Sequence, residues 1–131
     1  MTVENRRALV KAEMLRAAEA MREAEALARA GLPNGATSRA YYAAYHAASA
    51  LLAFLDVRAR THRGVHALLD KHAVTAGLLS TESLARFARL QERRSTADYG
   101  ASEQITAEQG VVILADANEF LDSIRKLVEG A

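Results

Sequence analysis

Arg94 and Asp98 form the pair of side chains with the clearest chemical potential in this sequence. They are four residues apart, so on a helix they lie on one face. A guanidinium group is a planar fork of hydrogen-bond donors that suits a phosphate or a carboxylate, and Asp98 could orient that fork. An ion pair that only secures a helix end, with Tyr99 packed beside it, explains the same spacing. Spacing alone favours this structural interpretation over a binding site.

Tyr42 and His46 are a second pair with the same spacing, and Arg39 precedes them by about one helical turn. A histidine can donate, accept or transfer a proton near neutral pH, so His46 is a candidate for proton transfer. A buried histidine that forms a hydrogen bond with a tyrosine would produce the same pattern. Taken by itself, the pair fits the structural interpretation better.

The most basic short segment contains Arg58, Arg60, His62, Arg63 and His66. Its positive charge could contact the backbone of an RNA, and a solvated loop is an equal alternative. His62 and His66 are spaced to bind a metal from one helix face, but no adjacent glutamate completes the zinc-protease signature. We therefore predict no metal site.

Three further arginines, Arg86, Arg89 and Arg93, are spaced three and four residues apart and so lie along one side of a helix. Such a ridge could follow the phosphates of a nucleic acid. A solvated face that is partly balanced by Glu82 and Glu92 explains the pattern better.

The composition excludes several kinds of chemistry. The sequence has no cysteine, which rules out disulfides, zinc–thiolate sites, iron–sulfur clusters and cysteine nucleophiles. It has no phosphate-binding glycine loop and no nucleophile elbow, and nothing in it predicts a cofactor. Neither a signal peptide nor a membrane span is recognisable, so we expect a cytoplasmic protein without membrane partners.

Charge is distributed unevenly along the chain. Residues 1–65 carry ten Lys or Arg and six Asp or Glu, whereas residues 66–131 carry seven and ten. This mild asymmetry could help a partner to dock, although solvated surfaces often show it by chance.

Helical periodicity predicts a single all-α domain over residues 1–131. The expected helices cover residues 3–30, 36–56, 62–75 and 81–97, and a last helix opens at Thr106 with a capping box. Long helices with short connections favour an antiparallel up-and-down four-helix bundle with an additional short helix.

Arg94 continues the apolar stripe of the fourth expected helix. That stripe consists of Leu84, Phe87 and Leu90. A charge in line with a core stripe needs a partner or water. The second expected helix offers Tyr42 and His46 on a polar face, so we expect these groups to meet Arg94 if the two helices are neighbours.

Four segments together carry a family resemblance. Residues 38–52 contain Arg-Ala-Tyr-Tyr-Ala-Ala-Tyr-His, residues 61–66 read Thr-His-Arg-Gly-Val-His, residues 93–99 read Arg-Arg-Ser-Thr-Ala-Asp-Tyr, and residues 105–109 read Ile-Thr-Ala-Glu-Gln. They resemble, in this order, the second-helix signature, the following segment, the arginine-to-tyrosine stretch and the closing segment of small stand-alone prokaryotic HEPN domains. This is the higher-eukaryote and prokaryote nucleotide-binding family, and the resemblance covers nearly the whole chain.

The resemblance implies a four-helix bundle that commonly forms a homodimer. It also implies either a metal-independent ribonuclease or the toxin-side partner of a minimal nucleotidyltransferase. Arg94 would then bind phosphate, Asp98 would orient it, and Tyr42, His46 and Tyr99 would line the pocket.

The usual ribonuclease arrangement is incomplete in this chain. Ribonuclease members place a histidine a few residues after the arginine, whereas here no histidine follows His72. His46 is therefore the candidate to complete a catalytic pair with Arg94 across space.

Three functional hypotheses remain open. The first is a HEPN-type protein that interacts with a nucleotide or RNA and pairs with a nucleotidyltransferase in a toxin–antitoxin-like system. The second is a non-enzymatic dimeric helical module in which the polar cluster only secures packing. The third is RNA binding without cleavage through Arg58, Arg60, His62 and Arg63.

Overall fold

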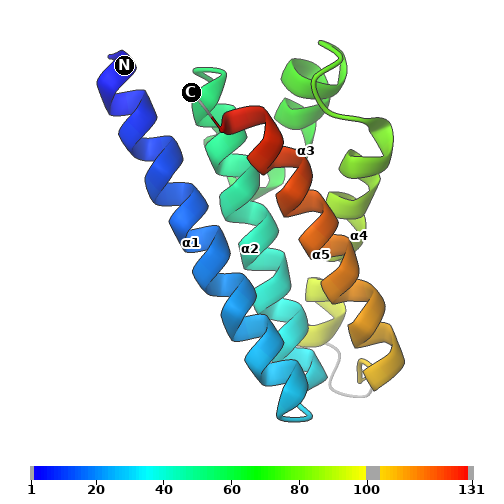
Figure 1. Cartoon of the computed structure of the whole chain (residues 1–131). Helices are drawn as coiled ribbons and strands as arrows, with labels where there is room; N and C mark the ends of the chain where they lie inside the picture. The colour runs from blue at the N-terminus through cyan, green and yellow to red at the C-terminus, as the bar shows by residue number, and fades with distance from the viewer. Residues whose placement is uncertain (1, 100–103, 130–131) are drawn as a thin grey trace.

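The computed structural model describes residues 2–99 and 104–129, except for the side chain of Tyr99. Its elements are α1 (Val3–Arg29), α2 (Pro33–Phe54), α3 (His62–Leu69), the π-helical turn η1 (Asp70–Val74), α4 (Thr81–Tyr99) and α5 (Ala107–Val128). The described residues contain no strand, which confirms the all-α prediction. The long helices α1, α2, α4 and α5 can be followed in Figure 1, and the short α3 and η1 come between α2 and α4 in the chain.

α2 is the central helix, because it packs against α1, α4 and α5. In Figure 1, α1 and α2 lie side by side and are joined by a tight turn. Gly31 in that turn has a φ of 78°, a left-handed conformation that glycine adopts without steric cost.

Alanine makes the central position of α2 possible, since small side chains let helices approach closely. The alanines of α2 that are buried are Ala36, Ala40, Ala43, Ala44, Ala47, Ala48, Ala50 and Ala53. The sequence predicted one apolar stripe on this helix, and the structure buries it on several faces because three helices surround it.

Most of the predicted helix ends agree with the structure. Thr106 and Gln109 form the expected capping box of α5. Ser80 caps α4, because its hydroxyl accepts a hydrogen bond of 3.0 Å from the backbone N–H of Ser83. The third predicted helix is present as α3 and η1, where the Thr75 N–H donates to the Asp70 carbonyl at 3.0 Å.

The bounds of α2 and α4 differ from the prediction. α2 begins at Pro33 and not at Ala36, because proline suits the first helical turn, where its missing N–H is not needed. α4 continues to Tyr99, past the predicted end at Ala97.

The largest side chains of the core lie between α2, α4 and α5. Phe87 on α4 stacks on Phe120 on α5, with ring centroids 5.3 Å apart, and lies 6.1 Å from the ring of Tyr41 on α2. All three side chains are buried. Tyr41 therefore contacts the apolar core on one side, and it also contacts Arg94, which is described below.

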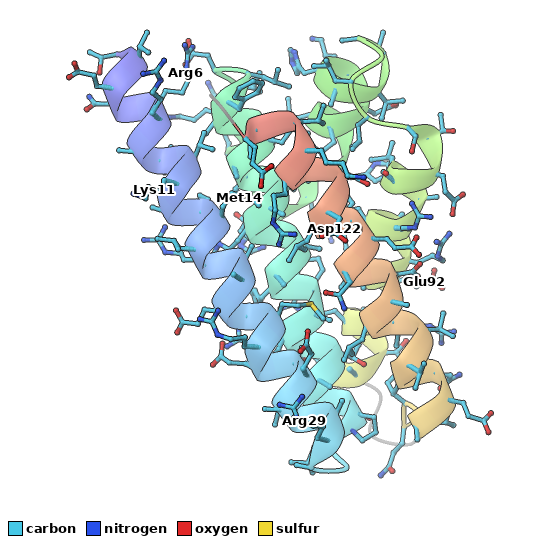
Figure 2. All side chains as sticks on the ribbon, in the orientation of Figure 1. Arg6, Lys11, Met14, Arg29, Glu92 and Asp122 are labelled. Carbon is cyan, nitrogen blue, oxygen red and sulfur yellow. The ribbon has the colours of Figure 1, made fainter. Side chains whose placement is uncertain are left out.

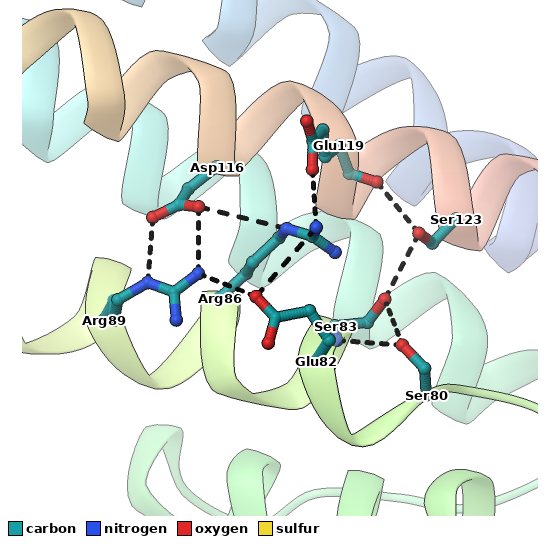
Figure 3. A network of polar contacts seen from close by, with 8 residues as sticks. All are labelled: Ser80, Glu82, Ser83, Arg86, Arg89, Asp116, Glu119 and Ser123. Atoms are coloured by element: carbon teal, nitrogen blue, oxygen red, sulfur yellow. Dashed lines mark hydrogen bonds and ion pairs between the residues drawn. The ribbon is translucent and has the colours of Figure 1, made fainter.

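An ion-pair network ties α4 to α5, as Figure 3 shows. Arg86 lies 2.6 Å from Glu119, and Arg89 donates two hydrogen bonds to Asp116 at 3.0 and 3.1 Å. The hydrogen bond to Asp116 raises the pKa of Arg89, which stays positively charged. These two arginines are thus engaged by acidic side chains of α5 in addition to Glu82, the acid of α4 noted from the sequence.

Candidate functional site

Arg94 lies at the contact between α4 and α2, where the sequence predicted it to meet Tyr42. Its Nη2 donates a hydrogen bond of 3.1 Å to the Tyr42 hydroxyl, and its Nε lies 2.8 Å from Oδ2 of Asp98. The Arg94 and Asp98 side chains are 28% and 29% exposed, so both are partly buried and still reachable from solvent. The structure therefore brings three of the predicted site residues together.

Two tyrosine rings form the floor beneath this guanidinium. The Cζ of Arg94 is 5.4 Å from the centre of the Tyr41 ring and 5.5 Å from that of Tyr42, distances at which a cation is attracted to an aromatic face. Burial raises the pKa of Tyr41, and the charge of Arg94 offsets part of that rise. Tyr41 is therefore a neutral phenol in the folded protein.

Asp98 is held by a residue that the sequence interpretation did not single out. The Ser38 hydroxyl of α2 donates a hydrogen bond of 2.5 Å to Oδ1 of Asp98. Ser38 precedes Tyr42 by four residues, so it lies on the same polar face of α2 as Tyr42 and His46. That spacing is the signal that could have revealed it.

Asn34 fixes the end of α4 against the beginning of α2. Its side-chain amide donates to the Ala97 carbonyl at 3.3 Å, and its side-chain oxygen accepts from the backbone N–H of Ile105 at 3.0 Å. This contact holds the backbone next to Asp98 in place. The position of the carboxylate therefore depends on α2 as well as on α4.

A second guanidinium lies close to the same tyrosine. The Cζ of Arg39 is 4.9 Å from the centre of the Tyr42 ring, and its Nη1 is 3.8 Å from Glu23 on α1. Arg39 and Arg94 both contact Tyr42, so two positive charges lie near one phenol. Among the described residues, Asp98 is the acidic partner of Arg94, and Glu23 is the acidic partner of Arg39.

His46 faces a different helix from the one expected. Its Nδ1 lies 2.9 Å from Oε2 of Glu13 on α1, and Glu13 also pairs with Arg16 at 2.8 Å. Tyr42, one turn earlier on α2, is the residue of this face that contacts Arg94. In the contacts of the described residues, Arg94 and His46 thus belong to two neighbouring clusters with different partners.

Glu13 could not be found from the spacing of residues, because it lies on another helix. The rotation of α1 against α2 decides which acidic residue of α1 meets His46. α1 contains other acids, such as the exposed Glu19 and Glu23, which the sequence offers equally as partners for His46.

The predicted RNA-contact residues lie around the start of α3. Arg58 and Arg60 are exposed in the connection before α3, and His62 and Arg63 begin that helix. The His62 ring stacks on Tyr45, with centroids 4.1 Å apart and planes 2° from parallel. In the part of the chain that the structure describes, none of these three arginines forms an ion pair.

A cavity of about 360 Å³ connects this basic segment to the cluster around His46. Its polar lining consists of Glu13, Tyr45, Ser49, Asp56 and Arg58, and apolar residues of α1, α2 and the connection after α2 contribute the rest. It lies beside the His62–Tyr45 stack, since Tyr45 belongs to both.

Two further predictions concern the side chain of Tyr99 and a metal site. The side chain of Tyr99, expected to line the pocket, lies outside the described residues, although its backbone is the last residue of α4. Among the residues described, no group of three or more histidine, aspartate or glutamate side chains is placed to hold a metal ion.

Residues 10–127 match the family model of the HEPN domain, a range that contains every side chain described above. The chain belongs to the HEPN domain family. A UPF0332 protein of Thermotoga maritima is 32% identical over 87% of this chain and 86% of its own length. A UPF0332 protein of Archaeoglobus fulgidus is 32% identical over 75% of this chain and 78% of its own.

A third relative of this HEPN domain comes from Methanocaldococcus jannaschii and is named "Putative toxin MJ0605". It is 30% identical over 75% of this chain and 72% of its own length. Within the described ranges of this HEPN domain, no helix combines the length and the apolar character that crossing a membrane requires. The resemblance drawn from residues 38–52, 61–66 and 93–99 is thereby confirmed at the level of the family.

Proposed function

We propose that this HEPN domain binds a phosphate group of a nucleotide or an RNA at Arg94, as the toxin-side component of a pair with a minimal nucleotidyltransferase. The observation that carries the proposal is the partly exposed side chain of Arg94, whose guanidinium is held by Asp98 and Tyr42 over two tyrosine rings. The relative named for a toxin supports the toxin role, and family membership supports the nucleotide or RNA ligand.

The chemistry of the site suits an anion with hydrogen-bond acceptors. Asp98 fixes the direction of the Arg94 fork, and a fixed fork loses less entropy when it binds a phosphate. Arg39 adds a second charge beside the Tyr42 ring. The Tyr42 hydroxyl, which accepts from Arg94, can itself donate to a phosphate oxygen.

Binding is better supported than cleavage. Metal-independent cleavage of RNA needs a group that removes a proton from the attacking hydroxyl, and His46 is the histidine nearest in the chain to Tyr42. Its described partner is Glu13, which would orient the imidazole. For catalysis, the other ring nitrogen would have to reach a phosphate bound at Arg94.

We predict that Arg94→Ala weakens the binding of ATP and of a single-stranded oligoribonucleotide by about tenfold or more, because a charge-assisted contact to phosphate is lost. Arg93→Ala is the matched control. Arg93 is the preceding residue, it is exposed, and it forms no ion pair among the described residues, so its removal should change affinity by less than about twofold. Titration calorimetry measures both affinities, and circular dichroism checks that each variant is folded.

Two results would contradict parts of this proposal. Equal affinity of the wild type and Arg94→Ala would remove the phosphate site. Equal RNA cleavage by both proteins, or cleavage by neither, would remove the ribonuclease role of Arg94 and His46. Whether a minimal nucleotidyltransferase co-purifies with the tagged protein from its source cells tests the pairing separately.

The non-enzymatic dimeric module is a second candidate, supported by one observation. Ser38, Asp98, Arg94 and Tyr42 form a continuous chain of contacts, as a purely structural network would. In that case Arg94→Ala lowers the melting temperature, and the wild-type protein binds no nucleotide.

RNA binding through the basic segment makes a distinct prediction. Replacement of Arg58, Arg60 and Arg63 by alanine should lower the slope of log affinity against log salt concentration by about 2, because each arginine that contacts a phosphate of a single strand contributes about 0.7. Fluorescence anisotropy with a labelled oligoribonucleotide measures this slope. A triple alanine variant of Arg22, Arg29 and Lys126, which are exposed elsewhere, is the control. An unchanged slope would exclude the basic segment as an RNA contact.

A further inference from the structure

A groove of about 670 Å³ lies between the first half of α1 and the end of α5, with the last residue of α2 at its floor. Its lining residues are Val3, Arg6, Arg7, Val10, Lys11, Met14, Leu15, Ala18, Phe54, Arg125, Val128 and Glu129. In Figure 2, Arg6 and Lys11 lie on the N-terminal part of α1 and Met14 lies between α1 and α5. None of these residues belongs to the Arg94 cluster.

The groove is elongated and mostly apolar. The residues that α1 contributes begin at Val3 and end at Ala18, and at about 1.5 Å per residue this stretch is about 22 Å long. Val10 and Met14 lie along it one turn apart. Val3 and Leu15 leave 52% and 62% of their surface in solvent, so they add exposed apolar area to the apolar lining of the groove.

The edge of the groove is positively charged. Arg6, Arg7 and Lys11 line it from α1, and in the described part of the chain none of them forms an ion pair. Arg125 lines it from α5 and pairs with Asp122 at 2.6 Å. Among the lining residues, Glu129 is the one acid. An occupant with negative charges beside an apolar surface would therefore be complementary.

We infer that this groove binds an amphipathic helix of a partner protein whose apolar face is flanked by acidic residues. A helix of about four turns matches the length of the groove, and its apolar residues at helical spacing would cover Val10, Met14 and Leu15. Acidic residues beside that face would pair with Arg7 and Lys11. A second copy of this chain is a poorer occupant, because pairing through the same face would bring like charges of two α1 helices together.

The groove lies at the C-terminal end of α2, whereas the Arg94 cluster contacts the first half of this helix. Phe54 is twelve residues after Tyr42, about 18 Å along the helix. The inference therefore does not rest on phosphate binding. The loss of one site can be measured while the other is intact.

A synthetic stapled helical peptide of about fifteen residues, with leucines on one face and glutamates on both flanks, tests the inference on the whole chain. A second peptide with lysine in place of each glutamate is the ligand control. We expect fluorescence polarisation to detect the glutamate peptide at micromolar concentration and the lysine peptide at least about tenfold more weakly.

Two charge-reversal variants locate the binding surface. Arg7→Glu with Lys11→Glu should weaken the glutamate peptide about tenfold or more. Arg22→Glu with Arg29→Glu changes the same charge on the other half of α1 and should leave affinity unchanged. All four side chains are exposed, so folding should be retained, and circular dichroism verifies it. Hydrogen exchange in residues 3–18 should slow when the peptide binds.

Several outcomes would overturn the inference. These are no binding of the glutamate peptide at about 1 mM, equal binding of both peptides, or equal effects of the two variants. Loss of a wild-type dimer in Arg7→Glu with Lys11→Glu, measured by analytical ultracentrifugation, would identify a second copy as the occupant. Binding of phosphatidylserine vesicles without peptide binding would identify a lipid surface instead.

Discussion

Phe87→Ala is expected to lower the free energy of unfolding by about 3–5 kcal/mol, the range for a large core side chain that is truncated. Phe87 is fully buried, stacks on Phe120 at 5.3 Å and contacts Tyr41 at 6.1 Å between ring centres. Alanine would leave a cavity between α2, α4 and α5 that rigid helices can close only in part. Urea unfolding followed by circular dichroism measures the loss, with little change in the slope against urea.

Phe87→Leu is the control for volume, since it keeps most of the apolar contacts and should cost less than half as much. Because the Tyr41 ring lies between Phe87 and Arg94, the alanine variant should also weaken ATP binding, whereas the leucine variant should not. A loss of stability below about 1 kcal/mol would mean that Phe87 is not at the centre of the core.

Asp98→Ala is the second substitution with a large expected effect. Whether it lowers or raises the affinity for ATP shows whether Asp98 positions Arg94 or only neutralises it. Asp98 pairs with Arg94 at 2.8 Å and accepts from Ser38 at 2.5 Å, and it is 29% exposed. Its removal should cost about 1–3 kcal/mol of stability, because a partly buried cation loses its anionic partner. If Asp98 orients Arg94, affinity for ATP should fall about tenfold, even though a negative charge has been removed.

Glu92→Ala separates orientation from charge. Glu92 is an exposed acid on the same helix, and it forms no ion pair in the described residues, so its removal changes the net charge equally without touching Arg94. Its affinity for ATP should stay the same or rise slightly. A rise in affinity for Asp98→Ala, measured by titration calorimetry, would mean that Asp98 only neutralises Arg94 and does not position it.

The proposed functions assign the first half of α2 and its C-terminal end to different ligands. The Arg94 cluster near Tyr42 would bind phosphate, and the groove at Phe54 would bind a partner helix. A HEPN domain built in this way could hold both ligands at once. Measuring ATP affinity with the glutamate peptide bound would show whether the two sites are independent.

The sequence by itself determined the helices and the pairs within them. Helix propensity, the capping box at Thr106 and the spacing of apolar residues predicted the all-α class, and the structure confirms it. The Arg94–Asp98 ion pair was likewise predictable, since residues four apart on a helix are always neighbours. The meeting of Arg94 with Tyr42 was expected because Arg94 continues the apolar stripe of its helix and Tyr42 lies on a polar face of α2.

Only the tertiary structure decided which helices face one another and with what rotation. It gave His46 its partner Glu13 on α1, gave Asp98 its partner Ser38 on α2, and placed Asp116 of α5 against Arg89. Contacts within a helix are fixed by a rise of about 1.5 Å and about 3.6 residues per turn. Contacts between helices depend on the combined packing of many small side chains, above all the alanines of α2, and no single spacing in the sequence encodes that sum.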